Sequence, residues 1–364
     1  MLDFTLDEEQ TMLTDAIHRY AEERIRKVFR DADEGGKIPP EIVQAGWDIG
    51  VLPAAIPEQY GGFGDQYSAV TGALAAEELA WGDLAVALNI LAPGAVAIPI
   101  LLAGTESQKE TYLPQFCDVT LPTLAAALVE PEIEFDPRGL MVTAVRSDNE
   151  YLLNGAKSVV PLADTAETFL VYANEDGQTQ AFFVPARSAG LAVGERDRLM
   201  GLRALPTFGL TLTNCRVPVE NKLGGAAGIN FGQILNHSRV TMAAAAVGIA
   251  RAGAEYAREY AKQRVQFGEP IAHRQSIAFM LAEMAIDVEA ARTMVWEAAW
   301  LIDQGKDATR EVTVMKQFVD EMAVRVADQA LQTLGGYGYI REYPVELWLR
   351  NARGFASLEG LAIA

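Results

Sequence analysis

The sequence predicts a mainly α-helical protein with a central β domain. Apolar residues recur at spacings of three and four from residue 6 to about residue 114, and again from residue 229 onward, which is the period of amphipathic helices. Between about residues 120 and 225, short runs of β-forming residues alternate with turn signals, as strands do. We therefore expect an N-terminal helical domain over residues 1–119, a central β domain over 120–226 and a C-terminal helical bundle over 227–364.

The N-terminal segment opens with the amphipathic stretch LDEEQTMLTDAIHRYAEERIRKVF and continues as helices punctuated by proline and glycine. The longest uncharged run, residues 84–104, would be long enough to span a membrane. Two prolines and two glycines interrupt this run, so we expect a buried helix–loop–helix rather than a membrane span.

In the central segment, the runs MVTAV, TFLVYA, QAFFVPA and GLTLTNCRV are separated by the turn signals NG, EDG and SAG, which predicts a small antiparallel sheet. The C-terminal segment returns to long, alanine-rich amphipathic stretches that suit a helical bundle. Its stretch AAAAVGIARAG fits either a close approach between helices or an ordinary tight core.

Composition argues against several classes of partner. The chain has 30 Lys and Arg against 49 Asp and Glu, a formal net charge of −19, which disfavours nucleic acid and anionic membranes. Cys117 and Cys215 lie far apart, and there are three histidines, so we expect no metal site and a reducing, cytoplasmic setting. The start, MLDFTLDEEQ, lacks the basic and apolar regions of a signal peptide.

Two C-terminal stretches carry residues suited to a ligand. In QRVQFGEPIAHRQSI, the guanidinium of Arg264 beside the aromatic Phe267 suits a pyrophosphate and a heterocycle. The alternative is a plain helix–turn–helix with a surface arginine. The stretch QTLGGYGYIREYPVE places Gly335 and Gly336 after a helix, where backbone can approach a ligand closely. It does not follow a strand, so the Rossmann fingerprint does not apply.

The chain closes with RNARGFASLEGLAIA, which places Glu359 among small and apolar residues. From this stretch alone, a solvated terminal acid is the plain interpretation. A carboxylate lined by Phe355, Leu358 and Leu361 would instead have a pKa raised by desolvation, which suits a general base.

The order of the segments and several long motifs closely resemble the acyl-CoA dehydrogenase family over nearly the whole chain. These motifs are RVQFG, QSIAFMLAEMA, QTLGGYGYIREYPVE, IPEQYGG, GTESQKETYLP and NCRVPVENKLG. The resemblance implies a barrel-like central β domain, a C-terminal four-helix bundle and assembly as a homotetramer. It also implies FAD as cofactor, an acyl-CoA thioester as substrate, a trans-2-enoyl product and an electron-transfer flavoprotein as acceptor, in fatty acid metabolism and lipid degradation.

The resemblance also assigns roles to residues. The implied contacts to the adenosine and pyrophosphate end of FAD are Arg264, Gln266, Phe267, Gln275, Gln332, Gly335 and Gly336. In the family they reach FAD from a neighbouring subunit, so an intact site implies at least a dimer. Glu359 matches the catalytic base, nine residues after Arg350, and Ser238 stands where some members carry an alternative base. The implied substrate contacts are Arg239, Asn236 and Gly360.

Two segments depart from the family pattern. The flavin-holding loop reads VEPEIEFDP, with Val129 and Phe135 in place of hydroxyl residues and with Glu132 and Glu134 adding negative charge. After the Gly-x-Lys turn, VVPL at residues 159–162 replaces Trp-Ile-Thr-Asn. The adenosine side of the expected site is therefore kept, while the isoalloxazine side is altered.

Three hypotheses follow. In the first, the chain is a working dehydrogenase whose flavin is held by rearranged backbone contacts. In the second, the chain is one subunit of a heterotetramer with a paralogous dehydrogenase subunit, to which it lends the adenosine-side contacts. In the third, the fold serves different chemistry on acyl thioesters. We expect the first and keep the second as its alternative.

Overall fold

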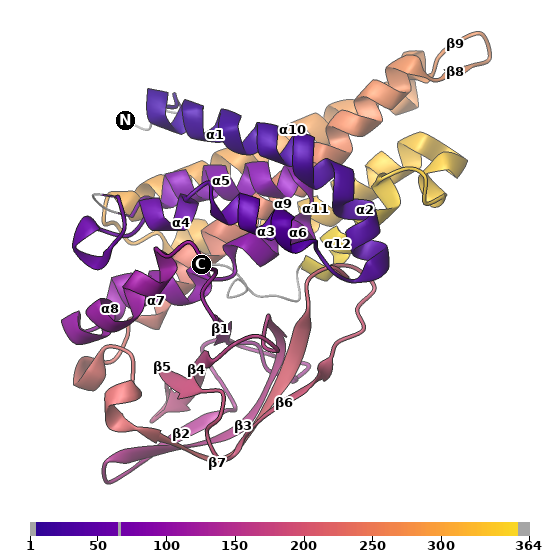
Figure 1. Ribbon diagram of the computed structural model, residues 1–364. Coiled ribbons are helices and arrows are strands. Elements are labelled where there is room, and N and C mark those ends of the chain that lie inside the picture. The colour runs from indigo at the N-terminus through magenta and orange to yellow at the C-terminus, as the bar shows by residue number, and fades with distance from the viewer. Residues whose placement is uncertain (1–4, 65–66, 356–364) are drawn as a thin grey trace.

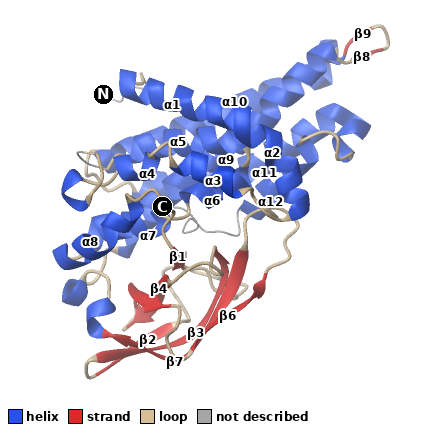
Figure 2. Ribbon diagram, viewed as in Figure 1, coloured by secondary structure: helices blue, strands red, loops and turns tan. Residues whose placement is uncertain are grey.

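The computed structural model describes residues 5–64 and 67–355. Helices from both ends of the chain form one body, and the sheet of the central domain lies beneath it (Figure 1). Figure 2 shows the same separation of helices and sheet. The expected fold class is confirmed. The element type changes between Phe116 and Leu124 and again between Pro218 and Phe231, and the domain limits after residues 119 and 226 stay a prediction.

In the described part of the chain, eight α-helices precede the sheet. They are α1 (Glu8–Tyr20), α2 (Arg26–Gly35), α3 (Pro40–Trp47), α4 (Val51–Ala54), α5 (Ala69–Gly82), α6 (Leu84–Leu91), α7 (Gly94–Ala103) and α8 (Glu106–Tyr112). Asp7 starts α1 in a capping box with Gln10, and Thr105 starts α8 in the same way with Gln108. Both boxes satisfy backbone amides that a helix start leaves unpaired.

Helices α6 and α7 form the uncharged run, with a turn at residues 92–93. Most of their residues are buried, as expected for a helix–loop–helix of the core. Within residues 5–64 and 67–355, no single helix is long and apolar enough to cross a membrane. Helices α6 and α7 reach that length and composition only as a pair, and the pair is bent by 41°.

The central sheet contains seven of the described strands. They are β1 (Leu124–Ala127), β2 (Thr143–Ser147), β3 (Glu150–Pro161), β4 (Thr168–Glu175), β5 (Gln178–Pro185), β6 (Leu191–Arg196) and β7 (Thr207–Pro218). Their order is β1-β4-β2-β3-β7-β6, with β5 paired to β4. Most pairs are antiparallel, as expected, but β4 runs parallel to β1 and, at one position, to β2. A parallel pair needs a crossover connection, which the intervening β2–β3 hairpin provides.

The C-terminal helices form the expected bundle. They are α9 (Phe231–Gln263), α10 (Gln275–Asp303), α11 (Thr309–Leu334) and α12 (Val345–Phe355). Helix α9 packs against α5, α10 and α11. A Cβ atom at Gly248 would lie 2.2 Å from the carbonyl oxygen of Glu77 on α5. At this point, the small residues of α9 therefore permit a close approach between helices.

Between α9 and α10, a short hairpin of β8 (Val265–Gln266) and β9 (Glu269–Pro270) projects from the body (Figure 1). Its turn residues, Phe267 and Gly268, have left-handed φ angles of 55° and 87°, as two-residue hairpin turns of this type require. The side chain of Phe267 is 92% exposed. The fold thus presents an aromatic ring at the tip of a protruding hairpin.

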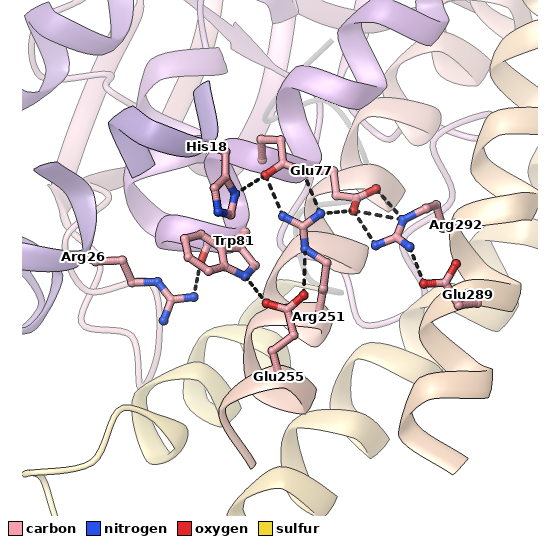
Figure 3. A network of polar contacts seen from close by, with 9 residues as sticks. His18, Arg26, Glu77, Trp81, Arg251, Glu255, Glu289 and Arg292 are labelled. Atoms are coloured by element: carbon pink, nitrogen blue, oxygen red, sulfur yellow. Dashed lines mark hydrogen bonds and ion pairs between the residues drawn. The ribbon is translucent and has the colours of Figure 1, made fainter. Parts of the chain in front are cut away.

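A network of ion pairs and hydrogen bonds joins α1, α5, α9 and α10 (Figure 3). Arg251 on α9 lies 2.8 Å from Glu77 and 2.6 Å from Glu78. Arg292 on α10 also lies 2.8 Å from Glu77, and His18 on α1 lies 2.7 Å from Glu78. Because α5 supplies both carboxylates, the network fixes the other three helices to it. The sequence pattern alone did not reveal this network.

Candidate functional site

Six of the seven residues predicted to contact FAD line one cavity of about 800 Å³ at the ends of α9 and α11 and the start of α10. They are Arg264, Gln266, Phe267, Gln332, Gly335 and Gly336. The seventh, Gln275, is the first residue of α10 and lies between Arg274 and Ser276, which both line the cavity. The fold therefore brings the two predicted stretches together.

Local structure fixes the walls of this cavity. Arg264 is the C-cap of α9, and its amide donates to the Tyr260 carbonyl at 2.8 Å. Its guanidinium carbon lies 5.0 Å from the centroid of the Tyr337 ring, a cation–π distance. Gly335 has a left-handed φ of 59°, and a Cβ atom at Gly335 or Gly336 would meet nothing within 4 Å. The backbone of this glycine turn is thus open to a ligand.

The chemistry of the cavity suits a nucleotide. Arg264 and Arg274 both line it, and none of its described lining residues is acidic, although Arg274 pairs with nearby Glu269 at 3.0 Å. Guanidinium groups bind phosphates, and the rings of Phe267 and Tyr337 offer surfaces for a heterocycle. The residues present therefore fit the adenosine and pyrophosphate end of FAD.

The two altered segments lie side by side. The amide of Ser158 on β3 donates to the carbonyl of Val129 at 2.8 Å, so the loop after β1 begins against the VVPL stretch. Ile133 in this loop is fully exposed, whereas Phe135 packs against an apolar cluster. Val159 has a left-handed φ of 53°, an unfavourable conformation for a β-branched residue. A flavin ring bound beside these segments would meet backbone groups and aliphatic side chains.

A buried ion pair holds the altered loop to the sheet. Lys157 Nζ lies 2.8 Å from Glu130 Oε1 and donates to the Leu128 carbonyl, also at 2.8 Å. The Glu130 carboxylate accepts from the amides of Met141 and Val142 at 2.6 and 2.9 Å. Both charged side chains are almost completely buried, and burial lowers the pKa of Lys157 to about 8. The pair therefore fastens both ends of the loop.

Replacing Lys157 with methionine is expected to destabilise the fold strongly, because it leaves the Glu130 carboxylate buried without a counter-charge. Breaking a buried pair in this way costs about 3–5 kcal/mol in the free energy of unfolding, which urea titration measures. The matched control is Arg216→Met, which breaks an exposed pair with Glu150 in the same sheet and should cost about 1 kcal/mol at most. Equal losses in the two variants would contradict the structural role of Lys157.

The start of α9 carries two of the predicted substrate residues. Asn236 is buried, and its Nδ2 donates to Thr309 Oγ1 at the start of α11, at 3.0 Å. Arg239 lies three residues further along the helix and is half-buried. Asn236 thus braces α9 against α11, and the substrate contacts of both residues stay predictions.

Sequence reasoning missed the neighbouring residue, His237. Its side chain is 4% exposed, and its ring centroid lies 5.3 Å from that of Tyr67. Its Nδ1 has no hydrogen-bond partner in the part of the chain that the structure describes. Burial lowers the pKa of His237 to about 4, so the imidazole is neutral at pH 7. Its place between Asn236 and Ser238, on the helix expected to line the substrate, is the signal that could have singled it out.

The buried His237 should make the fold sensitive to acid. Between pH 6.5 and about 4, the unfolded chain binds a proton at this residue that the folded chain does not. The free energy of unfolding should therefore fall as the pH drops through this window, by about 3 kcal/mol in total. Urea titrations of the parent and of His237→Gln at several pH values test this, since the variant should lose that component. Identical acid sensitivity in the two proteins would show that His237 titrates normally.

The predicted base and its neighbour lie outside the described residues. Helix α12 ends at the buried Phe355, four positions before Glu359 and five before Gly360 in the sequence. The roles of Glu359 and Gly360 therefore stay predictions.

A second cavity, of about 810 Å³, lies among α1, α3, α4, α5 and the α6–α7 pair, with one residue from α9. Its lining includes Trp47, Phe63, Tyr67 and Thr241. None of the residues predicted for FAD or substrate is among its described lining residues.

Comparisons with known proteins show which family this chain resembles. Family models of the acyl-CoA dehydrogenase N-terminal, middle and C-terminal domains match residues 7–120, 125–215 and 230–362. A probable acyl-CoA dehydrogenase of Bacillus subtilis is 35% identical, over 100% of this chain and 99% of the relative. A subunit of the caffeyl-CoA reductase–Etf complex of Acetobacterium woodii is 34% identical, over 97% of this chain and 95% of the relative.

Solved structures agree with these matches. Butyryl-CoA dehydrogenase of Megasphaera elsdenii superposes with a TM-score of 0.89 at 34% identity, over 99% of this chain and 96% of that one. The structure of PigA with FAD and proline superposes with a TM-score of 0.90 at 26% identity, over 99% and 96%. The chain belongs to the acyl-CoA dehydrogenase family, whose members are FAD-dependent oxidoreductases acting on CH–CH bonds.

Proposed function

We propose that the chain catalyses α,β-dehydrogenation of an acyl-CoA thioester to the 2-enoyl-CoA. The observation that supports this most is the cavity that gathers Arg264, Gln332 and Gly336, with open glycine backbone and no acidic group among its described lining residues. Such a cavity suits the nucleotide end of the cofactor. FAD, when bound, supplies the acceptor for the hydride.

In this proposal, Glu359 is the base. Its carboxylate takes the proton from the α carbon, the β carbon gives up a hydride, and the C=C bond forms between them. The α proton of a thioester is far less acidic than a carboxylic acid, so the base must be shielded from water and the carbonyl polarised. Phe355, the last described residue before Glu359 in the sequence, is itself buried in the core. Arg239 and Asn236 on α9 are the proposed substrate contacts.

We assign the reaction to fatty acid metabolism and lipid degradation, with an electron-transfer flavoprotein as the next electron acceptor. The acceptor is supported by the relative that is a subunit of a reductase–Etf complex. We place the chain in the cytoplasm, since Cys117 and Cys215 are both free thiols, as reducing compartments favour.

We further propose that the chain works as an oligomer. The nucleotide cavity lies at the projecting hairpin, where Phe267 is 92% exposed. Helix α10 also exposes Phe279 and Ile286, seven residues apart and hence on one face of the helix. Exposed apolar side chains that share a helix face suit contact with a neighbouring subunit. The neighbour is either a second copy, giving a homotetramer, or a paralogue, giving a heterotetramer.

The altered segments favour a second candidate function, that of a half-site subunit. Phe135 packs into an apolar cluster where the family pattern has a hydroxyl residue, and Val159 replaces an aromatic ring. In a heterotetramer, this chain would lend the cavity around Arg264 to a paralogous subunit that holds the flavin ring. Glu359 would then be idle.

Flavin content and molar mass, measured together, test both candidates. We expect an oligomer by light scattering, with less than one FAD per chain when the chain is expressed alone. FAD that reduces in the chain alone supports the working dehydrogenase. One FAD per pair, obtained only on co-expression with a paralogue, supports the half-site subunit. A monomer that holds FAD fully would contradict the proposed oligomer and the half-site subunit, because the cavity would then bind without a neighbour.

A further inference from the structure

The last described helix, α12, is held by residues from all three segments of the chain. At the partly buried side of α12, Arg350 binds both carboxylate oxygens of Asp33 on α2, at 2.8 and 3.1 Å. Arg350 also donates to the carbonyl of Met200, in the connection between β6 and β7, at 3.0 Å. A Cβ atom at Gly201 would lie 2.0 Å from the Arg350 carbonyl oxygen. The β6–β7 connection and α12 therefore touch backbone to backbone.

The next residue, Asn351, makes the buried contacts of the junction between α12 and the β6–β7 connection. Its side chain is 1% exposed. Its Oδ1 accepts from the amide of Leu202 at 2.7 Å, and its Nδ2 faces Asp83 Oδ2 at 3.3 Å. Leu202 has a left-handed φ of 55°, a conformation that leucine adopts only when its surroundings hold it there. The Asn351 amide is one of the groups that hold it.

Asp83 completes the chain of contacts. It is 2% exposed, and its other oxygen, Oδ1, accepts from the amide of Val86 at 3.0 Å and so caps the start of α6. One amide and one carboxylate thus join the start of α6, the β6–β7 connection and α12. Each donor in this set meets an acceptor, which buried polar groups require.

We propose that Asn351 is a positioning residue: through Asp83 and Leu202 it fixes the direction in which α12 leaves the body, and so places the segment that carries Glu359. This inference rests on the proposed function. Glu359 follows Asn351 by eight residues and the end of α12 by four. A displacement of about 1 Å of a catalytic group costs up to about 100-fold in rate, so the junction need not touch the substrate to matter.

Exchanging the amide and the carboxylate tests the proposal. In Asn351→Asp, two buried carboxyl groups face each other across the 3.3 Å contact, and one of them must take up a proton before a hydrogen bond can form there. In Asp83→Asn, two NH₂ groups face each other there, as long as the other bonds of both residues are kept. The double variant restores one carboxylate and one amide, and every bond to Leu202 and Val86 can be made again. The control is Arg353→Gln, on the exposed face of the same helix.

Each single variant should lower kcat by roughly 10- to 100-fold, with the dissociation constant of the CoA thioester unchanged. The double variant should return kcat to within about threefold of the parent. Should a single variant fail to fold, recovery in the double variant still supports the pairing. Unchanged kcat in the single variants, losses that add in the double variant, or a change in thioester binding alone would each overturn the proposal.

Amide hydrogen exchange of α12 gives a second readout that needs no activity. Exchange over residues 345–355 should become faster in each single variant and return to the parent rate in the double variant. If the parent turns over no thioester, the proposed function is wrong, but the amide exchange of α12 still tests the junction. Exchange that stays at the parent rate in both single variants would overturn the junction itself.

Discussion

Replacing Glu359 with glutamine is expected to lower kcat for acyl-CoA dehydrogenation by at least about 10²-fold, and up to about 10⁴-fold. The amide is nearly isosteric with the carboxylate, so fold, flavin content and thioester binding should be kept, whereas the proton acceptor is lost. On α9, Ser238 stands where some family members carry an alternative base, and it supplies no carboxylate. Steady-state rates with an artificial electron acceptor and titration with a thioester measure the two effects separately.

A matched control is Glu342→Gln, which removes an exposed acid just before α12 and should leave kcat unchanged. A Glu359→Gln variant that turns over like the parent would mean that Glu359 is a solvated terminal acid. The base would then belong to another residue or to a partner subunit.

Replacing Arg264 with alanine is expected to weaken FAD binding by roughly 10- to 100-fold, because a charge-assisted contact to a phosphate contributes about 1.5–3 kcal/mol. The fold should survive, since Arg264 lies at the end of α9 and lines the cavity rather than the core. Flavin retained after gel filtration, and the affinity of the flavin-free protein for added FAD, both measure the loss.

The matched control is Arg258→Ala, on the same helix, where the arginine is exposed and paired with its neighbour Glu259. It should leave FAD binding unchanged. Equal flavin loss in both variants would point to a general effect of charge, and full flavin in Arg264→Ala would mean that the cavity is not the nucleotide site.

The fold class and the nucleotide cavity were accessible from the sequence because both rest on local patterns. Helical and strand periods give the element types, and the stretches around Arg264 and Gly335 carry their chemistry within a few residues. The parallel pairing of β1 with β4 was missed, since strand order depends on which segments meet in space. The residues of a single strand carry no local signal for which strand it pairs with.

The buried polar pairs were missed for the same reason. Lys157 and Glu130 are 27 residues apart, and Asn351 and Asp83 are 268 apart. A polar residue in an apolar segment indicates that some partner exists, but only the tertiary structure selects which one. The left-handed backbone of Val159 was missed as well. It runs against the intrinsic preference of a β-branched residue, so it depends on tertiary contacts that the sequence does not show.

The central claim, that this chain oxidises acyl-CoA thioesters, is tested most directly by anaerobic titration of the purified FAD-loaded protein with thioesters of increasing acyl length. We expect at least one thioester to bleach the visible absorbance of the flavin, with formation of the matching 2-enoyl-CoA and with the bleaching lost in Glu359→Gln. Thioesters that bind to the FAD-loaded protein but leave its flavin oxidised across the whole series would contradict the claim.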